Sequence, residues 1–255
     1  KIEAGQAGFE DLERYMLDES SVWPGVQAPR YAEERSFAGY RRAAARGVGT
    51  RNYIVILGSS SRVSGYAKAL EERLMGLAER YEHIDGIVAV AHTEGGGYSR
   101  PNNLELVLRA LAGFVVHPNV GAVLAVDYGD EAVNNELLQR YLIEHGYPLG
   151  DVPHQFLTIS DGFQSSLDHG ASIVGGWLDQ VNSTPRTVES LAHLKVALQC
   201  GGSDAFSGVS GNPLAAWVAK EIIRYGGSAN LAETDELIGA EHYVLQNVKD
   251  VGTAR

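Results

Sequence analysis

The sequence Tyr53-Ile54-Val55-Ile56-Leu57-Gly58-Ser59-Ser60-Ser61 decides the fold class of this chain. Its first five residues are apolar and rich in β-branched side chains, which is typical of a strand buried on both faces. A glycine and three serines end the run, and residues 63–81 follow with apolar residues at helical spacing. The stretch therefore predicts a strand, a loop and a helix of one α/β unit.

The same unit recurs along the chain with short connections. We expect further strands at 84–90, 121–126, 155–160, 195–198 and 228–233, and further helices at 103–116, 131–145, 165–181 and 213–225. This alternation predicts an α/β fold with an open, mostly parallel, Rossmann-like sheet and helices on both faces. Because right-handed crossovers place every strand-to-helix loop on one edge, the loops at 58, 95, 129 and 201 are expected to converge.

The first part of the chain has a different character. Residues 1–46 contain Trp23-Pro24-Gly25 and a charged, aromatic stretch, and we interpret them as an arm or linker before an α/β domain at 47–255. Arg41, Arg42 and Arg46 could reach an anionic ligand from this arm, or they could be solvated linker charges.

Composition excludes several functional classes. The chain has 255 residues, a formal net charge of −11 and one cysteine. The acidic balance argues against a nucleic-acid binder, and no apolar run is long enough to cross a membrane. One cysteine excludes an internal disulfide and a multi-cysteine metal site. We expect a cytoplasmic protein and a homo-oligomer.

The loop after the second strand carries candidate chemistry. His92 stands where a ligand or a general base would stand, although a lone histidine can also be structural. Gly95, Gly96 and Gly97 could wrap an anion with backbone N–H groups, or they could form a structural turn. Neither a P-loop nor a dinucleotide-binding glycine pattern is present, so a nucleotide-binding protein is the weakest alternative.

The loop after residue 198 carries the densest set of polar residues. Its candidates for binding a polar ligand or a cation are Cys200, Gly201, Gly202, Ser203, Asp204, Ser207 and Asn212. Cys200 is a nucleophile, a soft metal ligand or a small core residue. Asn212 also fits a helix N-cap, with Pro213 in the first turn. Ser59 and Ser60 offer similar hydroxyls from the first loop. His242, after Glu241, is a further candidate ligand.

Several of these motifs occur in an order that resembles the altronate and galactarate dehydratase family, which also contains sulfolactate sulfo-lyase-like members. The resemblance covers residues 37–245. The run from Gln199 to Pro213 is its most specific part, and the other motifs are Phe37-x-Gly39-Tyr40-x-Arg42, Val48 to Tyr53, His92-x-x-Gly95-x-Gly97, His117-Pro118-Asn119, Glu233-Thr234 and Gly239-Ala240-Glu241-His242.

The resemblance implies a lyase of sugar-acid catabolism. Such a hydro-lyase removes water from an aldonate or aldarate and forms a 2-keto-3-deoxy acid, with a divalent metal, usually iron, associated with the activity. On this hypothesis His92, Ser203 and Asp204 are catalytic. The substrate would contact Ser59, Ser60, Gly95, Gly97, Gly201, Gly202, Ser207 and Asn212, and the metal ligands would be His92, Cys200, Glu241 and His242.

The chain departs from the family pattern at two places. Family members usually carry cysteine at the position of Gly96, and often another just after the first strand, where this chain has Ser59, Ser60 and Ser61. These departures leave three alternatives. The chain could use an oxygen-ligated metal such as manganese or magnesium, or act on a different hydroxy acid such as sulfolactate. It could also be a non-catalytic binding or assembly subunit. The family continues beyond Gly239-Ala240-Glu241-His242, so we expect this chain to be part of a longer protein or of an assembly.

Overall fold

The polypeptide divides into two units in a computed structural model, which describes residues 17–43, 46–160, 162–199, 201–202 and 204–254. One unit spans Arg35–His193, and the other joins Leu194–Arg255 to the segment before Arg35. Both contain parallel strands and helices, which confirms the predicted α/β class.

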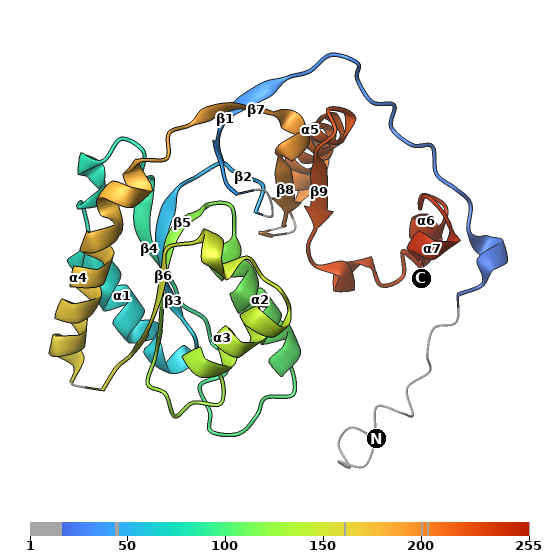
Figure 1. The fold of residues 1–255 in the computed structure, drawn as a ribbon. Coiled ribbons are helices and arrows are strands. Elements are labelled where there is room, and N and C mark those ends of the chain that lie inside the picture. Colours follow the sequence, from blue (N-terminus) through green and yellow to red (C-terminus); the bar gives the residue numbers. More distant parts are fainter. Residues whose placement is uncertain (1–16, 44–45, 161, 200, 203, 255) are drawn as a thin grey trace, which may run out of the picture. The chain divides into compact units, whose positions relative to one another are not determined.

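The larger unit is built on a four-stranded parallel sheet in the order β4-β3-β5-β6 (Figure 1). Its strands are β3 (Tyr53–Gly58), β4 (Gly86–Val90), β5 (Val120–Asp127) and β6 (His154–Thr158). Tyr53 pairs with Gly86 on one side and with Val120 on the other, so β3 lies inside the sheet. The strand predicted from the opening stretch is therefore confirmed.

Helices cover both faces of this sheet (Figure 1). Ile54 and Ile56 of β3 pack with α1 (Ser64–Arg73) and α4 (Phe163–Asn182). Val55 and Leu57, which alternate with them, pack with α2 (Leu104–Val116) and α3 (Asn135–Glu144). This alternation explains why β3 is apolar throughout: each face of the strand meets a helix layer.

Helix α1 is shorter than the predicted helix at 63–81, which is wrong beyond residue 73. The helix ends at Arg73, and Gly76 follows with φ +77°. A left-handed residue cannot continue a right-handed helix, and glycine adopts this conformation without a Cβ clash. A short 3-10 turn at Ala78–Arg80 then leads into β4.

A small antiparallel sheet accompanies the parallel one in the same unit. Its order is β2-β1-β7, with β1 (Ser36–Arg41), β2 (Val48–Gly49) and β7 (Thr187–Ser190). Strand β1 lies within the segment that the sequence predicts as an arm. The Arg41 guanidinium forms an ion pair with the buried carboxylate of Glu189 in the same unit.

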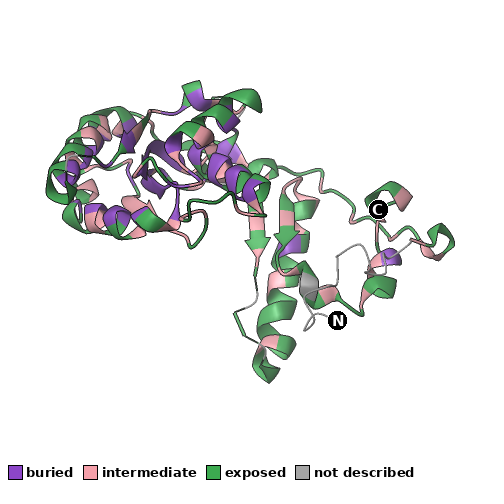
Figure 2. Ribbon diagram, turned by 90° about the horizontal axis from the view of Figure 1, so that it is seen from below, coloured by how far each residue is buried: buried purple, intermediate pink, exposed green. Residues whose placement is uncertain are grey.

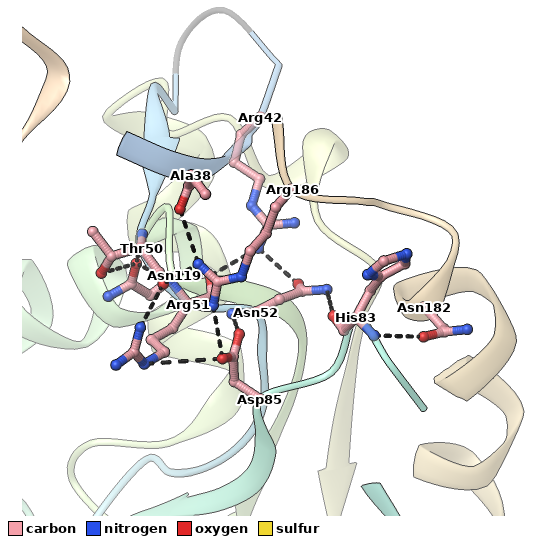
Figure 3. A network of polar contacts seen from close by, with 10 residues as sticks. All are labelled: Ala38, Arg42, Thr50, Arg51, Asn52, His83, Asp85, Asn119, Asn182 and Arg186. Carbon is pink, nitrogen blue, oxygen red and sulfur yellow. Dashed lines mark hydrogen bonds and ion pairs between the residues drawn. The ribbon is translucent and has the colours of Figure 1, made fainter. Parts of the chain in front are cut away.

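Polar contacts join this small sheet to the amino-terminal edge of the parallel sheet (Figure 3). Arg186 donates to the carbonyl oxygens of Ala38 (3.0 Å) and Thr50 (3.1 Å) and to Asp85 Oδ1 (2.9 Å). Arg42 donates to Asn52 Oδ1 at 2.7 Å, and burial followed by repulsion from Arg46 lowers the pKa of Arg42 to about 10. These arginines therefore have structural roles.

Arg46 also acts on the backbone. Its guanidinium donates to the carbonyl oxygens of Val116, His117, Val120 and Asp151. It thereby satisfies carbonyls at the carboxyl end of α2 and at the start of β5.

The smaller unit has a sheet of its own. Its strands β8 (Lys195–Leu198) and β9 (Ser228–Leu231) pair in parallel, and α5 (Asn212–Arg224) connects them. The prediction that these strands extend the same sheet as β3 is wrong, because they pair with each other. Short helices α6 (Glu241–Leu245) and α7 (Val251–Ala254) follow.

The two units differ in how much they bury. Buried residues, purple in Figure 2, gather on the strands and helices of the unit at Arg35–His193, whereas α5 buries only Ala219 and Ile222. Residues 17–34 belong to the smaller unit, where the Trp23 N–H donates to the Leu245 carbonyl and the Tyr31 N–H to the Arg224 carbonyl. Within the part of the chain that is described, no helix has the length and apolar character of a membrane span.

Candidate functional site

The loops that follow β3, β4 and β5 meet at the carboxyl edge of the parallel sheet. The Ser61 N–H donates to the Glu94 carbonyl at 2.8 Å, which joins the first loop to the second. The Ala132 N–H donates to the Gly97 carbonyl at 2.8 Å, which joins the second loop to the third. The predicted convergence of the loops at 58, 95 and 129 is confirmed. Open α/β sheets bind ligands at this edge.

Ser59 and Ser60 are fully buried at the end of β3. Ser59 Oγ donates to Asn135 Oδ1 at 2.6 Å, and Ser60 Oγ donates to Glu131 Oε1 at 3.1 Å. Both hydroxyls hold the first loop against the start of α3. They stabilise the loops at this edge and are not exposed to solvent in this structure.

Two carboxylates that were absent from the predicted set lie beside these serines. Asp127 accepts the Asn135 N–H and the Thr158 hydroxyl, both at 2.7 Å. Burial raises the pKa of Asp127, and the nearby charges of Glu131 and Asp130 raise it further, while the two hydrogen bonds act in the opposite direction. Glu131 is buried and also accepts the Tyr128 N–H at 3.0 Å. An acid directly after a wholly apolar strand is the signal that could have identified Asp127.

His92 is held by the backbone through both ring nitrogens. Nε2 lies 2.9 Å from the Gly58 carbonyl oxygen, and the Glu94 N–H points to Nδ1 at 3.2 Å. A carbonyl can only accept, so Nε2 carries the proton and Nδ1 carries the lone pair. The protein thereby fixes the tautomer and aims a basic nitrogen at the loop that follows β4.

The two departures from the family pattern lie next to each other. A Cβ atom on Gly96 would stand 2.2 Å from Ser61 Oγ and 3.1 Å from Arg62 Cγ. The glycine at 96 and the serine at 61 therefore fill one small space between the first and second loops. A larger residue at 96 requires Ser61 to move.

The predicted residues of the other loop belong to the smaller unit. Asp204 accepts the N–H groups of Phe206 (2.8 Å) and Ser207 (2.9 Å) and the Ser207 hydroxyl (2.7 Å). These bonds, those from Ser207 first, lower the pKa of Asp204. Asp204 thus caps a helix that begins at Ala205 and runs through a π-helical turn at Ser207–Gly211 into α5.

Asn212 lies inside this continuous helix, so the prediction that it is the N-cap is wrong. It lines a hollow of about 310 Å³ at the carboxyl ends of β8 and β9, together with Gln199 and Glu233. Gly201 and Gly202 are exposed, whereas Cys200 and Ser203 lie outside the described residues.

The predicted metal ligands come from both units of the chain. His92 belongs to one unit, and Glu241 and His242 belong to the other. Glu241 accepts the Gly239 N–H at 3.0 Å, and His242 Nε2 lies 2.8 Å from Gln246 Nε2. No group of three or more histidine, cysteine, aspartate or glutamate side chains in the described chain could hold a metal ion.

Two family models together match most of the chain. The family model "D-galactarate dehydratase/Altronate hydrolase, second domain" matches residues 39–182, and "D-galactarate/Altronate dehydratase, C-terminal" matches residues 191–255. The boundary between the two matches falls near the boundary between the two structural units.

Three relatives illustrate the range of the similarity. Altronate dehydratase of Escherichia coli is 29% identical over 93% of this chain and 47% of its own length. Galactarate dehydratase (L-threo-forming) of E. coli is 31% identical over 82% and 41%. The (2R)-sulfolactate sulfo-lyase subunit beta of Chromohalobacter salexigens is 26% identical over 82% and 49%. The chain spans about half the length of the curated relatives that it matches. By the match over residues 39–182, the chain belongs to the D-galactarate dehydratase/altronate hydrolase family.

Proposed function

We propose that this chain dehydrates a sugar acid, an aldonate or aldarate, to a 2-keto-3-deoxy acid. The observation that carries the proposal is the oriented imidazole of His92 at the carboxyl edge of the sheet, in a chain whose family includes altronate and galactarate dehydratases. The reaction removes a proton from the carbon next to the carboxylate and a hydroxyl from the carbon beyond. The enol that results tautomerises to the keto acid.

His92 is the proposed base. Its Nε2–H bond to the Gly58 carbonyl makes Nδ1, which accepts the Glu94 N–H, the nitrogen that would take a proton. The bond from the Glu94 N–H to Nδ1, at 3.2 Å, lies at the long end of the normal range, so a substrate C–H can replace it at low cost. A positioned base of this kind contributes roughly 10²–10⁴-fold to a rate.

Asp127 and Glu131 would act as positioning residues at this edge of the sheet. Both are buried, and Glu131 receives the Ser60 hydroxyl and the Tyr128 N–H. Through Ser60, Glu131 holds the β5 loop against the β3 loop, next to Gly58, whose carbonyl holds the ring of His92.

The proposal is tested by incubating the purified full chain with a panel of aldonates and aldarates, with and without added iron, manganese or magnesium. We expect formation of a 2-keto-3-deoxy acid from altronate or galactarate. In D2O the product should carry one deuterium at C3, because the enol takes a solvent proton there. The absence of keto acid from every member of the panel under every metal condition would refute the proposal.

The similarity to a sulfolactate sulfo-lyase subunit supports a second candidate, C–S cleavage of sulfolactate. The same base would remove the proton next to the carboxylate, and sulfite would leave in place of hydroxide. Sulfite release from sulfolactate, without keto acid from the sugar acids, would favour this reaction. Binding of a hydroxy acid without turnover of any substrate would instead indicate a binding subunit.

A further inference from the structure

Arg62 lies at the carboxyl edge of the parallel sheet, where residues of other loops hold its side chain. It follows Ser61 directly, and its Cζ lies over the rings of Tyr98 (5.4 Å to the centroid) and Tyr128 (5.3 Å). Its Nη1 donates to Asp130 Oδ1 at 2.6 Å. The partners come from the loops after β4 and β5, so three loops converge on one guanidinium.

The loops around Arg62 are rich in acidic residues. In residues 58–64, 91–103 and 127–135 the arginines and lysines are Arg62 and Arg100, whereas Glu94, Asp127, Asp130 and Glu131 carry carboxylates. Arg62, which contacts residues of the other two loops, therefore offers an anionic ligand at this edge a positive charge among several carboxylates. The electron-rich faces of two tyrosine rings stabilise the cation and restrict its movement.

We propose that Arg62 is the binding site for the carboxylate of the ligand, and that Asp130 is a displaceable internal substitute for that carboxylate. The inference rests on the proposed function, since it assumes a hydroxy-acid ligand at this edge. A guanidinium has five N–H donors in one plane, which suits a planar carboxylate. Among the described residues its side chain makes one hydrogen bond, to Asp130, so donors remain for a ligand.

The exposure of the ion pair allows a ligand to replace Asp130. The side chain of Asp130 is 57% exposed and that of Arg62 is 34% exposed, so water and ligand can reach the pair. An exposed ion pair of this kind contributes little to stability. A ligand carboxylate can replace Asp130 without leaving a buried charge unpaired.

The test measures binding of galactarate and of galactitol, its neutral counterpart, to the full chain by calorimetry. Arg62→Met should weaken galactarate binding by about ten- to a hundredfold, and Arg62→Lys should recover part of the loss. Asp130→Asn should strengthen it by about two- to fivefold, because it removes the internal competitor. Galactitol binding should change in none of them. Arg140→Met, which removes an exposed arginine paired with Glu136 on α3, is the matched control.

The outcomes separate the two proposals. A wild-type chain that binds neither galactarate nor altronate would refute the proposed function and this inference with it. A wild-type chain that binds, with Arg62→Met binding equally well at an unchanged urea midpoint, would refute this inference alone. Asp130→Asn binding more weakly than wild type would also overturn it, because a structural ion pair predicts that result and a displaceable one does not.

Discussion

Three consecutive glycines, Gly95, Gly96 and Gly97, form the middle of the loop after β4, and the structure predicts a different effect of alanine at each. Gly95 has φ +71°, and a Cβ there would lie 2.6 Å from Cγ2 of the buried Val133. The left-handed conformation and the collision with a branched core side chain together should cost about 2–5 kcal/mol. Gly95→Ala should therefore lower the free energy of unfolding strongly.

The other two positions are more permissive. At Gly96 the nearest atom to a Cβ is Ser61 Oγ at 2.2 Å, and a hydroxymethyl group can rotate away at about 0.5–1.5 kcal/mol. At Gly97 the nearest atom is Ser99 N at 4.0 Å, so alanine fits and should stabilise by about 0.4–1 kcal/mol through the unfolded chain. Neither φ falls in the left-handed region.

The assay is urea unfolding of the wild type and the three variants, followed by circular dichroism and tryptophan fluorescence. The expected order of stability is Gly97→Ala at or above wild type, then Gly96→Ala, then Gly95→Ala well below. Each variant is a control for the other two, because all three carry the same substitution at adjacent positions of one loop. Equal stabilities in all three, or Gly97→Ala as the least stable, would refute the loop geometry that positions His92.

Further predictions concern charge and hydrogen bonding. Burial raises the pKa of Asp127, so the carboxyl group binds its proton more tightly in the folded chain than in the unfolded chain. The contribution of Asp127 to the free energy of unfolding therefore falls as the pH rises from the ordinary aspartate pKa of about 3.9 through the raised folded-state pKa. The free energy of unfolding of wild type minus that of Asp127→Asn should thus decrease between pH 4 and pH 7, and a flat difference would contradict this. Arg186→Met should cost about 1–3 kcal/mol in urea unfolding, since it removes three hydrogen bonds at the amino-terminal edge, whereas the exposed-pair control Arg140→Met should cost less than about 0.5 kcal/mol. Asp204→Ala should reduce helicity at 222 nm by loss of the cap on the helix that leads into α5, and unchanged helicity would contradict that role.

Local patterns predicted the strands and helices that bury apolar residues. Residues 53–57 are apolar on both faces because helices cover both faces of β3, and the pattern shows this directly. The end of α1 was missed because a helical pattern continues past Gly76, whose left-handed conformation depends on the chain that follows. Strands β1 and β7 were missed because neither has a run of buried apolar residues, and their pairing joins residues far apart in sequence.

Strand pairing is the information that the sequence pattern lacks. The sequence pattern predicts strands at 195–198 and 228–233, and β8 and β9 are found there, but nothing local shows that they pair with each other and not with β3. Their burial is incomplete, unlike that of β3 and β5. The loops of the smaller unit were therefore joined to the site by a topology that the structure does not have.

The candidate site was predicted in position and only partly in composition. His92, Ser59 and Ser60 do lie at one edge, since parallel strands bring their carboxyl ends together. The roles of the serines depend on Asn135 and Glu131, which lie more than seventy positions later in the sequence. Arg62 gains its significance from Tyr98, Tyr128 and Asp130, and only the packed loops place these around it.

The most direct measurement is the rate of 2-keto-3-deoxy acid formation from altronate and galactarate by wild-type chain and His92→Ala side by side. The account predicts that the wild type forms the keto acid and that His92→Ala is slower by roughly 10²-fold or more, with an unchanged urea midpoint. Equal rates for the two proteins would contradict the assignment of the base, and keto acid from neither would contradict the proposed reaction.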